Sequence, residues 1–357
     1  MYYVSRRGFL RTLVAASTLS LAAGALGACA GDIQPSGSVP GSTVSSARAP
    51  EPSASPAARP GESKADPTAL PSSVTTEMEV RLVPSPTPAA LPHIAVVKGN
   101  DAASITEAAI TAIGGIERFV KPGKSVIIKP NICRAAKPEV GATTTPEVVG
   151  KLVELSRKAG ASSVRVMDLG WAGESQYYQM TGIEAAVKAA GGQMLLMDGR
   201  TGYVKTPIPK GRALKEYEIF SEALKTDVLI NVPIAKNHSM SILTLGIKNL
   251  MGLVKDRPSI HANFAQRLPD LFSVLTPTLT VIDATRVMIA NGPTGGRLED
   301  LLVMNTVIAS PDTVAADAYA TRFWGLKPKE IPYIRTAAEM GLGSIDLQQL
   351  RIAELQV

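Results

Sequence analysis

Cysteine is scarce in this chain of 357 residues, which contains only Cys29 and Cys133. Two thiols cannot supply the four thiolates of a ferredoxin-type cluster or of a four-cysteine zinc site. A framework of several disulfides is excluded for the same reason. We therefore expect no iron–sulfur cluster in this chain.

Aromatic residues and strong net charge are also lacking. Aromatic residues make up 4% of the sequence, and 37 Lys and Arg against 31 Asp and Glu give a net charge of +6. Without Arg6, Arg7 and Arg11, which lie in a segment that we expect to be removed, 34 basic residues against 31 acidic residues leave +3. This mild excess, with no arginine-rich or aromatic-interleaved stripe, argues against nucleic acid as a partner. The 45% of hydrophobic residues is typical of a globular protein.

No long apolar run is present near the N-terminus. The run Leu13 to Leu26 has only 14 residues, too few for a comfortable membrane span. It follows "SRRGFLR", which resembles the twin-arginine translocation motif through Arg6 and Arg7. It ends in "LGAC", which resembles a lipobox whose cysteine, Cys29, is diacylated. We predict that the protein is exported folded and is lipid-anchored to the membrane, facing outside the cytoplasm. An ordinary amphipathic helix is the alternative.

Three regions follow from the composition. Residues 1–28 are predicted to be the twin-arginine signal peptide with its lipobox. Residues 29–92 are rich in Pro, Ser and Ala, and such a segment cannot bury enough apolar area to offset its ordering entropy. We interpret it as a disordered tether that holds the folded part away from the bilayer. Residues 93–357 are predicted to form one globular α/β domain.

From His93 onward, short β-branched runs alternate with helical stretches. This alternation predicts an α/β fold with a mainly parallel sheet and helices on both faces. Thr145 with Pro146 marks the start of one helix, and Gly160 and Gly191 stand where helices end. The predicted strands are HIAVVKG, SVIIKPN, SVRVMDLG, QMLLMDG, DVLINVPI and LTVIDA.

Polar side chains stand at the ends of four of these runs. Loops that leave the carboxyl edge of a parallel sheet line one crevice, so we expect these side chains to share a site. For each one, an ordinary solvated loop residue is the alternative. The glycine-rich turn after the last run matches neither a P-loop nor a dinucleotide fingerprint. The strand-end residues are Lys129, Asn131, Asp168, Asn231, Lys236, His238 and Asp283.

The stretch "KNHSMSILTLGIKNLMG", from Lys236 to Gly252, sets charged and polar residues into an apolar run. We predict a helix from Ser239 to about Met251 that is apolar around most of its circumference and therefore buried. A lysine carried into that setting, Lys248, requires an anionic partner. The alternative is that its ammonium reaches the surface.

Five motifs together resemble the family called domain of unknown function 362. The resemblance implies a domain and a set of recurrent positions, but no reaction. Many relatives carry a ferredoxin-like segment with two four-cysteine clusters, which this chain lacks, so a redox partner follows by family analogy only. The motifs are KPN (Lys129 to Asn131), TTTPEVV (Thr143 to Val149), PIAKNHSMSILTLGIKNLMG (Pro233 to Gly252), NGPTGG (Asn291 to Gly296) and DTVAADAYAT (Asp312 to Thr321).

From these observations we select candidate site residues. The candidate catalytic residues are Lys236, His238 and Lys248. Ligand contacts are expected from Lys129, Asn131, Thr144, Asn249, Asn291 and Gly292. Asp168 and Asp283 are candidate ligands of a divalent metal. Cys133 is interpreted as a small buried residue near the Lys129 loop, with a role as ligand or nucleophile as the alternative.

Two function classes remain open. In the first, the protein is an envelope enzyme whose lysines bind a small anionic substrate while His238 or an aspartate moves a proton. In the second, it is a lipoprotein that captures a small anionic ligand without chemistry. Both hypotheses require Lys236, His238 and Lys248 to meet in one pocket. The cofactor, if there is one, is not identified by the sequence.

Overall fold

A computed structural model describes residues 90–170, 176–295 and 297–357. The predicted export signal at Arg6 and Arg7 and the predicted lipidation site at Cys29 lie outside the described residues, as does the predicted tether up to residue 89. Gly296 of the glycine-rich turn lies outside them as well. Of the helices in the described part of the chain, none has the length and apolar character needed to cross a bilayer.

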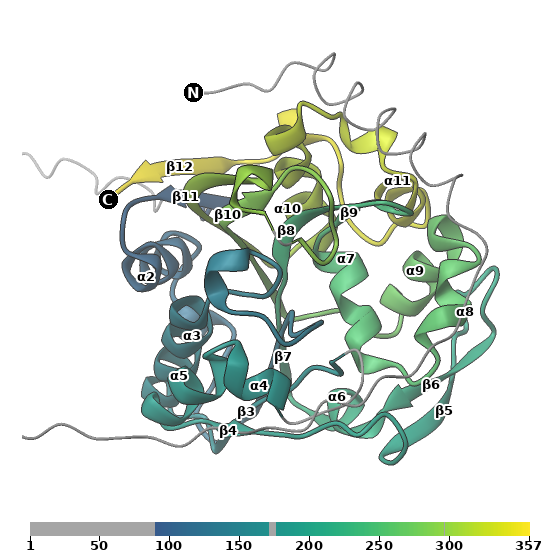
Figure 1. The fold of residues 1–357 in the computed structure, drawn as a ribbon, viewed down its shortest axis with the longest axis horizontal. Helices are drawn as coiled ribbons and strands as arrows, with labels where there is room; N and C mark the ends of the chain where they lie inside the picture. The colour runs from purple at the N-terminus through teal and green to yellow at the C-terminus, as the bar shows by residue number, and fades with distance from the viewer. Residues whose placement is uncertain (1–89, 171–175, 296) are drawn as a thin grey trace, which may run out of the picture. The chain divides into compact units, whose positions relative to one another are not determined.

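The strands follow one another along the described part of the chain with helices between most of them (Figure 1). The strands are β1 (Ile94–Lys98), β2 (Ser125–Pro130), β3 (Ser163–Val166), β4 (Gln193–Met194), β5 (Tyr203–Pro207), β6 (Glu216–Phe220), β7 (Val228–Val232), β8 (Ile234–His238), β9 (Ile242–Thr244), β10 (Leu279–Met288), β11 (Leu301–Ser310) and β12 (Ile352–Gln356). The α-helices are α2 (Ala102–Ala112), α3 (Pro146–Lys158), α4 (Gln176–Met180), α5 (Ile183–Ala189), α6 (Ser221–Lys225), α7 (Gly246–Asn249), α8 (Arg257–His261), α9 (Phe264–Phe272), α10 (Thr313–Ala320) and α11 (Pro332–Glu339).

Within the described residues, ten strands form one sheet in the order β12-β1-β11-β10-β7-β2-β3-β4, with β8 paired to β10 and β9 paired to β8. β11 is antiparallel to both of its neighbours, and β9 is antiparallel to β8. The other pairings in this sheet are parallel. The prediction of a mainly parallel sheet is therefore confirmed. β5 and β6 form a separate antiparallel pair.

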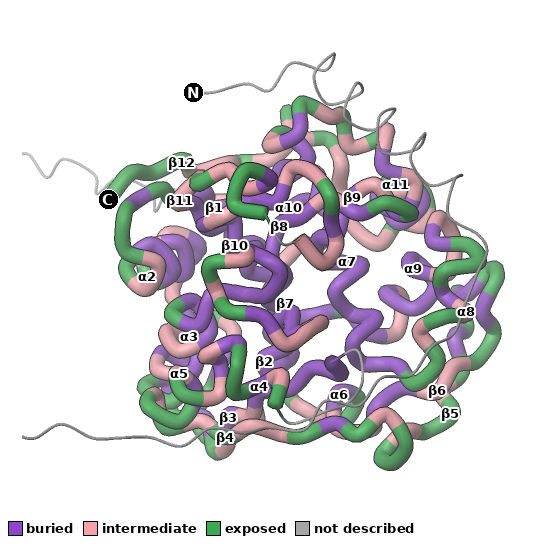
Figure 2. Tube along the Cα trace, in the orientation of Figure 1, coloured by how far each residue is buried: buried purple, intermediate pink, exposed green. Residues whose placement is uncertain are grey.

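The sheet separates two hydrophobic cores. Successive residues of a strand point to opposite faces, and β2 accordingly sends Val126 and Ile128 into one core and Ile127 into the other. The first core is completed by α2, α3 and α5, and the second by α7, α9, α10 and α11. Figure 2 shows that β2, β7 and α7 are buried along their lengths. The predicted helices on both faces are thus present.

The predicted helix punctuation is also observed. Thr145 is the N-cap of α3, and Pro146 is its first helical residue. Gly160 and Gly191 follow α3 and α5 with φ angles of +85° and +79°, which residues with a Cβ atom rarely adopt.

Two local predictions are wrong. The predicted helix from Ser239 is instead a turn followed by β9, and only Gly246–Asn249 is α-helical, because β9 pairs with β8. β10 does not end at Asp283 but continues to Met288, because it pairs with β11 across an irregularity between Ala284 and Arg286.

Candidate functional site

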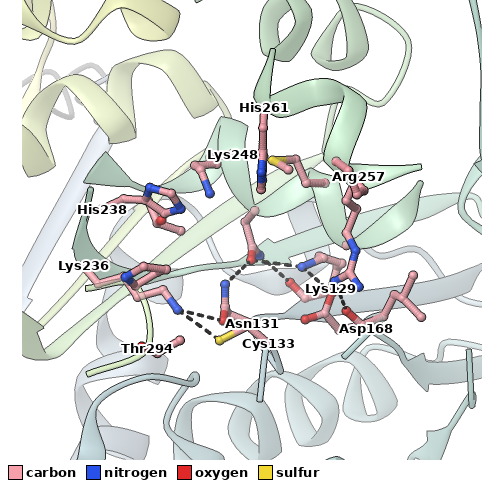
Figure 3. Close-up of a pocket in the computed structure, with 17 residues that line it drawn as sticks. Lys129, Asn131, Cys133, Asp168, Lys236, His238, Lys248, Arg257, His261 and Thr294 are labelled. Carbon is pink, nitrogen blue, oxygen red and sulfur yellow. Dashed lines mark hydrogen bonds and ion pairs between the residues drawn. The ribbon is translucent and has the colours of Figure 1, made fainter. Parts of the chain in front are cut away.

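A pocket of about 400 Å³ lies at the carboxyl ends of β2 and β3, beside β8 and under α7 and α8 (Figure 3). A site is expected at this edge of the sheet, because the loops that leave the carboxyl ends of parallel strands line one crevice. The structure brings the three candidate catalytic residues together there. The lining includes Lys129, Asn131, Cys133, Asp168, Lys236, His238, Thr244, Lys248, Asn249, Gly252, Arg257, His261 and Thr294.

The floor of the pocket is a buried ion pair. Lys129 Nζ lies 2.7 Å from Asp168 Oδ1, and both side chains are almost fully buried. The second oxygen of Asp168 accepts the backbone N–H of Ile132 at 2.5 Å. Lys129 Nζ also donates to Pro130 O at 2.8 Å and to Asn249 Oδ1 at 3.0 Å. Each charge is therefore compensated and hydrogen-bonded, as burial requires.

Gly252 allows this pair to form. A Cβ atom at this position would lie 1.8 Å from Asp168 Oδ1 and 2.7 Å from Lys129 Nζ. The backbone also needs to approach closely, because Leu169 donates its N–H to Gly252 O at 3.1 Å. The close packing of the ion pair thus explains why position 252 is a glycine.

Asparagine side chains connect the floor to the elements around it. Asn249 Oδ1 accepts from Lys129 and from Asn131, and Asn249 Nδ2 donates to Asn231 Oδ1 at 2.9 Å. Asn231 in turn donates to Gly246 O at 2.9 Å. This network fixes α7 to the ends of β2 and β7, so the residues on α7 have a defined position in the pocket.

Lys236 lies on one wall and is almost fully buried. Its Nζ donates to Ala142 O at 2.7 Å, to Asn131 Oδ1 at 3.3 Å and to Cys133 Sγ at 3.3 Å. Lys236 and His238 are two residues apart on β8 and therefore point to the same face. Thr244, paired with Lys236 across the strands, lines the pocket as well.

His238 is held in one orientation by the turn that follows it. Its Nδ1 accepts the backbone N–H groups of Met240 at 3.0 Å and of Ser241 at 3.3 Å. A nitrogen that accepts carries no proton, so the proton of the neutral ring lies on Nε2. Burial, together with Lys248 and Lys236, lowers the pKa of His238 to about 3. The ring is therefore a neutral N–H donor at physiological pH.

Lys248 differs from the other two lysines. Its side chain is more than nine-tenths buried, and within the described residues its Nζ makes neither a hydrogen bond nor an ion pair. It lies 5.2 Å from the ring centroid of Phe264. Burial and the nearby Lys236 lower the pKa of Lys248 to about 7. Figure 3 shows its amine pointing into the pocket.

α7, which carries Lys248, is fixed at its start by a buried carboxylate from another helix. Asp317 of α10 accepts the N–H of Gly246 at 2.6 Å and that of Ile247 at 3.0 Å. Burial raises the pKa of Asp317 to about 7. A Cβ at position 246 would lie 2.7 Å from Asp317 Oδ1, so the glycine permits this contact.

Three further pocket residues were not among the polar residues expected at the strand ends. Arg257 and His261 come from α8 on the opposite wall, and Arg257 donates to the carbonyl oxygens of Leu169 and Gly170 at 2.9 and 3.0 Å. Burial and Lys248 lower the pKa of His261. Cys133 lines the pocket, and it is only partly buried. Its place two residues after Asn131 is the one signal in the sequence that pointed to it.

Four of the candidate site residues, and the strand-end residue Asn231, do not line the pocket. Asp283 lies within β10, where its carboxylate accepts Thr145 N at 2.7 Å and Thr285 N at 2.9 Å. Thr144 joins Asn131 N to Val232 O. Asn291 donates to Asp300, and Gly292 donates its N–H to Asn237 Oδ1. These residues shape the loops and strands around the site, while Pro293 and Thr294 of the same turn reach it.

The two candidate metal ligands are not brought together in one pocket. Asp168 is paired with Lys129, and Asp283 is occupied by backbone donors. Among the residues that the structure describes, no group of three or more His, Cys, Asp or Glu side chains is arranged to hold a metal ion. The arrangement instead presents cations and N–H donors to the pocket.

Comparison with known proteins identifies relatives. Residues 126–322 match the profile of a family described as Domain of unknown function (DUF362). A thylakoid-associated protein of Synechocystis sp. is 29% identical over 248 residues, which are 64% of this chain and 72% of that protein.

Solved structures with a similar arrangement share little sequence with this chain. The lactate racemase apoprotein from Thermoanaerobacterium thermosaccharolyticum aligns at a TM-score of 0.40 with 14% identity, over 64% of this chain and 56% of that chain. A protein from Thermotoga maritima aligns at 0.35 with 10% identity, over 67% and 60%. This chain thus spans less than two thirds of each solved chain.

Proposed function

Since the chain belongs to the DUF362 family, whose profile matches 197 of its 357 residues, we propose that its pocket binds a small organic anion and moves a proton on it. One observation carries the proposal. Lys248 places a buried amine in the pocket, and among the described residues this amine has no hydrogen-bond or ion-pair partner. A buried ammonium is costly unless it is paired, and a bound anion supplies the missing partner.

The balance of charge around the pocket supports anion binding. Lys236 and Lys248 have no carboxylate partner within the described residues, and Asp168, the one carboxylate that lines the pocket, is paired with Lys129. A volume of about 400 Å³ falls in the range of small-molecule sites. The pocket therefore matches a small carboxylate or phosphate compound.

Two side chains support proton transfer. With a pKa of about 7, Lys248 exists in both protonation states at neutral pH, as an acid–base catalyst requires. His238, held neutral with its proton on Nε2, is suited to donate a hydrogen bond to negative charge that develops on the substrate. A binder without chemistry would need only the charge of the lysines.

Exchange of substrate hydrogens with solvent tests this proposal. The protein is incubated in D₂O with a set of small carboxylates, and loss of C–H signals is followed by NMR while calorimetry measures binding. We expect at least one bound anion to exchange, and Lys248→Gln to slow the exchange by about 10²-fold. Lys210→Gln, at an exposed lysine outside the pocket, is the matched control. Binding without exchange would favour the ligand-binding lipoprotein, and absence of binding would contradict both functions.

We propose in addition that the protein is exported folded by the twin-arginine pathway and is lipid-anchored through Cys29. This proposal is supported by the order and spacing of "SRRGFLR", the 14-residue apolar run and "LGAC" in the sequence. The anion-binding pocket would then work outside the cytoplasm. Its substrate would be a small anion present in that compartment.

A further inference from the structure

The surroundings of Lys236 are short of negative charge. This ammonium is almost fully buried, and two of its three contacts are neutral carbonyl oxygens, those of Ala142 and Asn131. No carboxylate forms an ion pair with it in the described part of the chain. The third contact, Cys133 Sγ at 3.3 Å, is the one ionisable group bonded to it. A thiolate at this position would neutralise the buried ammonium.

The same thiol is open to the pocket. Cys133 is partly exposed and lines the cavity with Lys248 and Thr244. Lys248 is a second sign of a ligand. It is more than nine-tenths buried, and its amine points into this cavity without a hydrogen-bond or ion-pair partner among the described residues (Figure 3). Thr244 Oγ1 is likewise buried without a hydrogen-bond partner. A bound anion would thus lie beside both the sulfur and an unpaired cation.

We propose that Cys133 is a thiolate paired with Lys236, and that it adds to the carbonyl carbon of a small carboxylate with an aldehyde or ketone group, held in the pocket by Lys248. The inference rests on the proposed function, since it requires an anion in the same pocket.

The addition balances with the groups that the pocket supplies. Sγ forms a bond to the carbonyl carbon, and the π electrons of the C=O bond move to the oxygen. That oxygen takes a proton from the ammonium form of Lys248, which is left as a neutral amine. The product is a hemithioacetal, and the reverse of these steps releases the substrate. No oxidant, reductant or leaving group is needed.

The charged groups that face the thiol are mainly cations. The alternative is a neutral thiol that donates to Ala142 O, which lies 3.5 Å from the sulfur and already accepts from Lys236. The ionisable groups that line the pocket with Cys133 are Lys129, Lys236, Lys248, Arg257, His238, His261 and Asp168. The carboxylate among them is paired with Lys129, so the field at the sulfur is set mainly by cations.

Alkylation of the full chain tests the inference. Reaction with iodoacetate forms a bond from Sγ to carbon and releases iodide, and mass spectrometry of the peptide that contains Cys133 gives the rate between pH 5.5 and 9. An ordinary thiol has a pKa of about 8.5 and is about 1% ionised at pH 6.5. We expect Cys133 to react at pH 6.5 at least about tenfold faster than glutathione, since its larger thiolate fraction outweighs its lower nucleophilicity. A rate that follows the pH dependence of glutathione would overturn the thiolate.

Three comparisons make the result specific. Lys236→Met should remove the excess rate at pH 6.5, while Lys210→Met should keep it. The ratio of the alkylation rate with iodoacetate to the rate with neutral iodoacetamide should be larger for Cys133 than for glutathione, because the pocket binds carboxylates. Glyoxylate, which has an electrophilic carbon, should protect Cys133 at lower concentration than acetate. If Lys236→Met does not fold, the pH profile of the unmodified protein decides alone.

The outcomes separate this inference from the proposed function. If Cys133 behaves as an ordinary thiol while calorimetry still detects bound carboxylates, the inference is wrong and the proposed function stands. If the thiolate profile is observed but iodoacetate gains nothing over iodoacetamide and no carboxylate binds, the substrate class and the proposed function fail together. Equal protection by glyoxylate and acetate overturns the covalent step alone.

Discussion

The buried amine of Lys248, which we propose binds the substrate, should lower the stability of the folded protein. Burial lowers its pKa from 10.5 to about 7, so the folded protein holds fewer protons than the unfolded chain between these two pH values. Stability then rises with pH across this window. The buried ammonium is most destabilising below pH 7, where it is charged in both states.

Replacing Lys248 by methionine should remove this penalty. At pH 6 we expect the free energy of unfolding to increase by roughly 2–5 kcal/mol, since each pKa unit corresponds to about 1.4 kcal/mol. The gain should shrink as the pH rises from 7 towards 10, because the native amine is then neutral. Urea denaturation of both proteins at several pH values measures the difference. A gain independent of pH would show that better packing, and not charge, is responsible, and Lys210→Met is the control for loss of a surface charge.

His238 should separate catalysis from binding. In the variant His238→Gln, the amide oxygen retains an acceptor for Met240 N or Ser241 N, so the turn after β8 has a partner for its backbone. The Nε2–H donor is lost from its present position. We expect the Kd of a bound anion to change by less than about threefold and the proton exchange to slow by about 10²-fold. His93→Gln, outside the pocket, should affect neither quantity, and equal losses in binding and exchange would contradict the donor role.

The pocket residues that the sequence predicted are mostly those that follow a predicted strand. Lys236 and His238 were found because both follow a predicted strand, and their i, i+2 spacing explains why they share a face. Arg257 and His261 were missed, because they reach the pocket from a helix whose orientation depends on tertiary packing. Asp283 was misplaced, because no local pattern shows that β10 continues beyond it.

The short 3-10 helix Leu250–Leu253, which follows α7, holds the tightest packing of the site. In Gly252→Ala, the new methyl group would occupy the space of Asp168 Oδ1 and separate it from Lys129. Breaking a buried ion pair costs about 3–5 kcal/mol, so we expect a loss of that order in the free energy of unfolding. Chemical denaturation measures it, together with weaker anion binding.

A second glycine provides a matched comparison. Gly150 lies inside α3, and a Cβ there would meet its nearest neighbour, Ala186, at 3.4 Å. Gly150→Ala should therefore be neutral or should stabilise the helix by up to about 1 kcal/mol. If both glycine variants lose similar stability, the ion pair is not the cause of the effect at Gly252.

Among the elements, the sequence predicted mainly those strands that stand out as apolar runs between helical stretches. The runs that became β1, β2, β7 and β10 are near-continuous apolar segments, as is typical of buried parallel strands. The segment 239–245 was mistaken for a helix because its turn is stabilised by a side chain, the Nδ1 of His238, which no periodicity reveals. β11 was not predicted, although it pairs with β1 and β10.

At the scale of the whole molecule, the pocket requires a folded core before any of its chemistry exists. Its residues lie between positions 129 and 294. They come from β2 and the loop after it, the loop after β3, β8, β9, α7 and the 3-10 helix after it, α8 and the turn after β10. These positions fall within the region 126–322 that matches the family profile. If the chain were exported unfolded, the buried ion pair and its hydrogen-bond network would have to form after transport. The twin-arginine pathway transports folded proteins, so the pocket would already be formed.

Export of the whole protein is tested by substitutions in the N-terminal motifs. In cells, Cys29→Ser should move the protein from the membrane fraction to the soluble fraction outside the cytoplasm, because the acylated thiol is absent. Arg6→Lys combined with Arg7→Lys should instead retain the uncleaved chain in the cytoplasm, where its mass includes residues 1–28. Fractionation, mass spectrometry and labelling with a radioactive fatty acid distinguish these results. Lys64→Arg, a charge-conserving change in the tether, should leave the location unchanged. Incorporation of the fatty-acid label into Cys29→Ser would contradict the lipid anchor. Normal export of the double arginine variant would contradict the twin-arginine route.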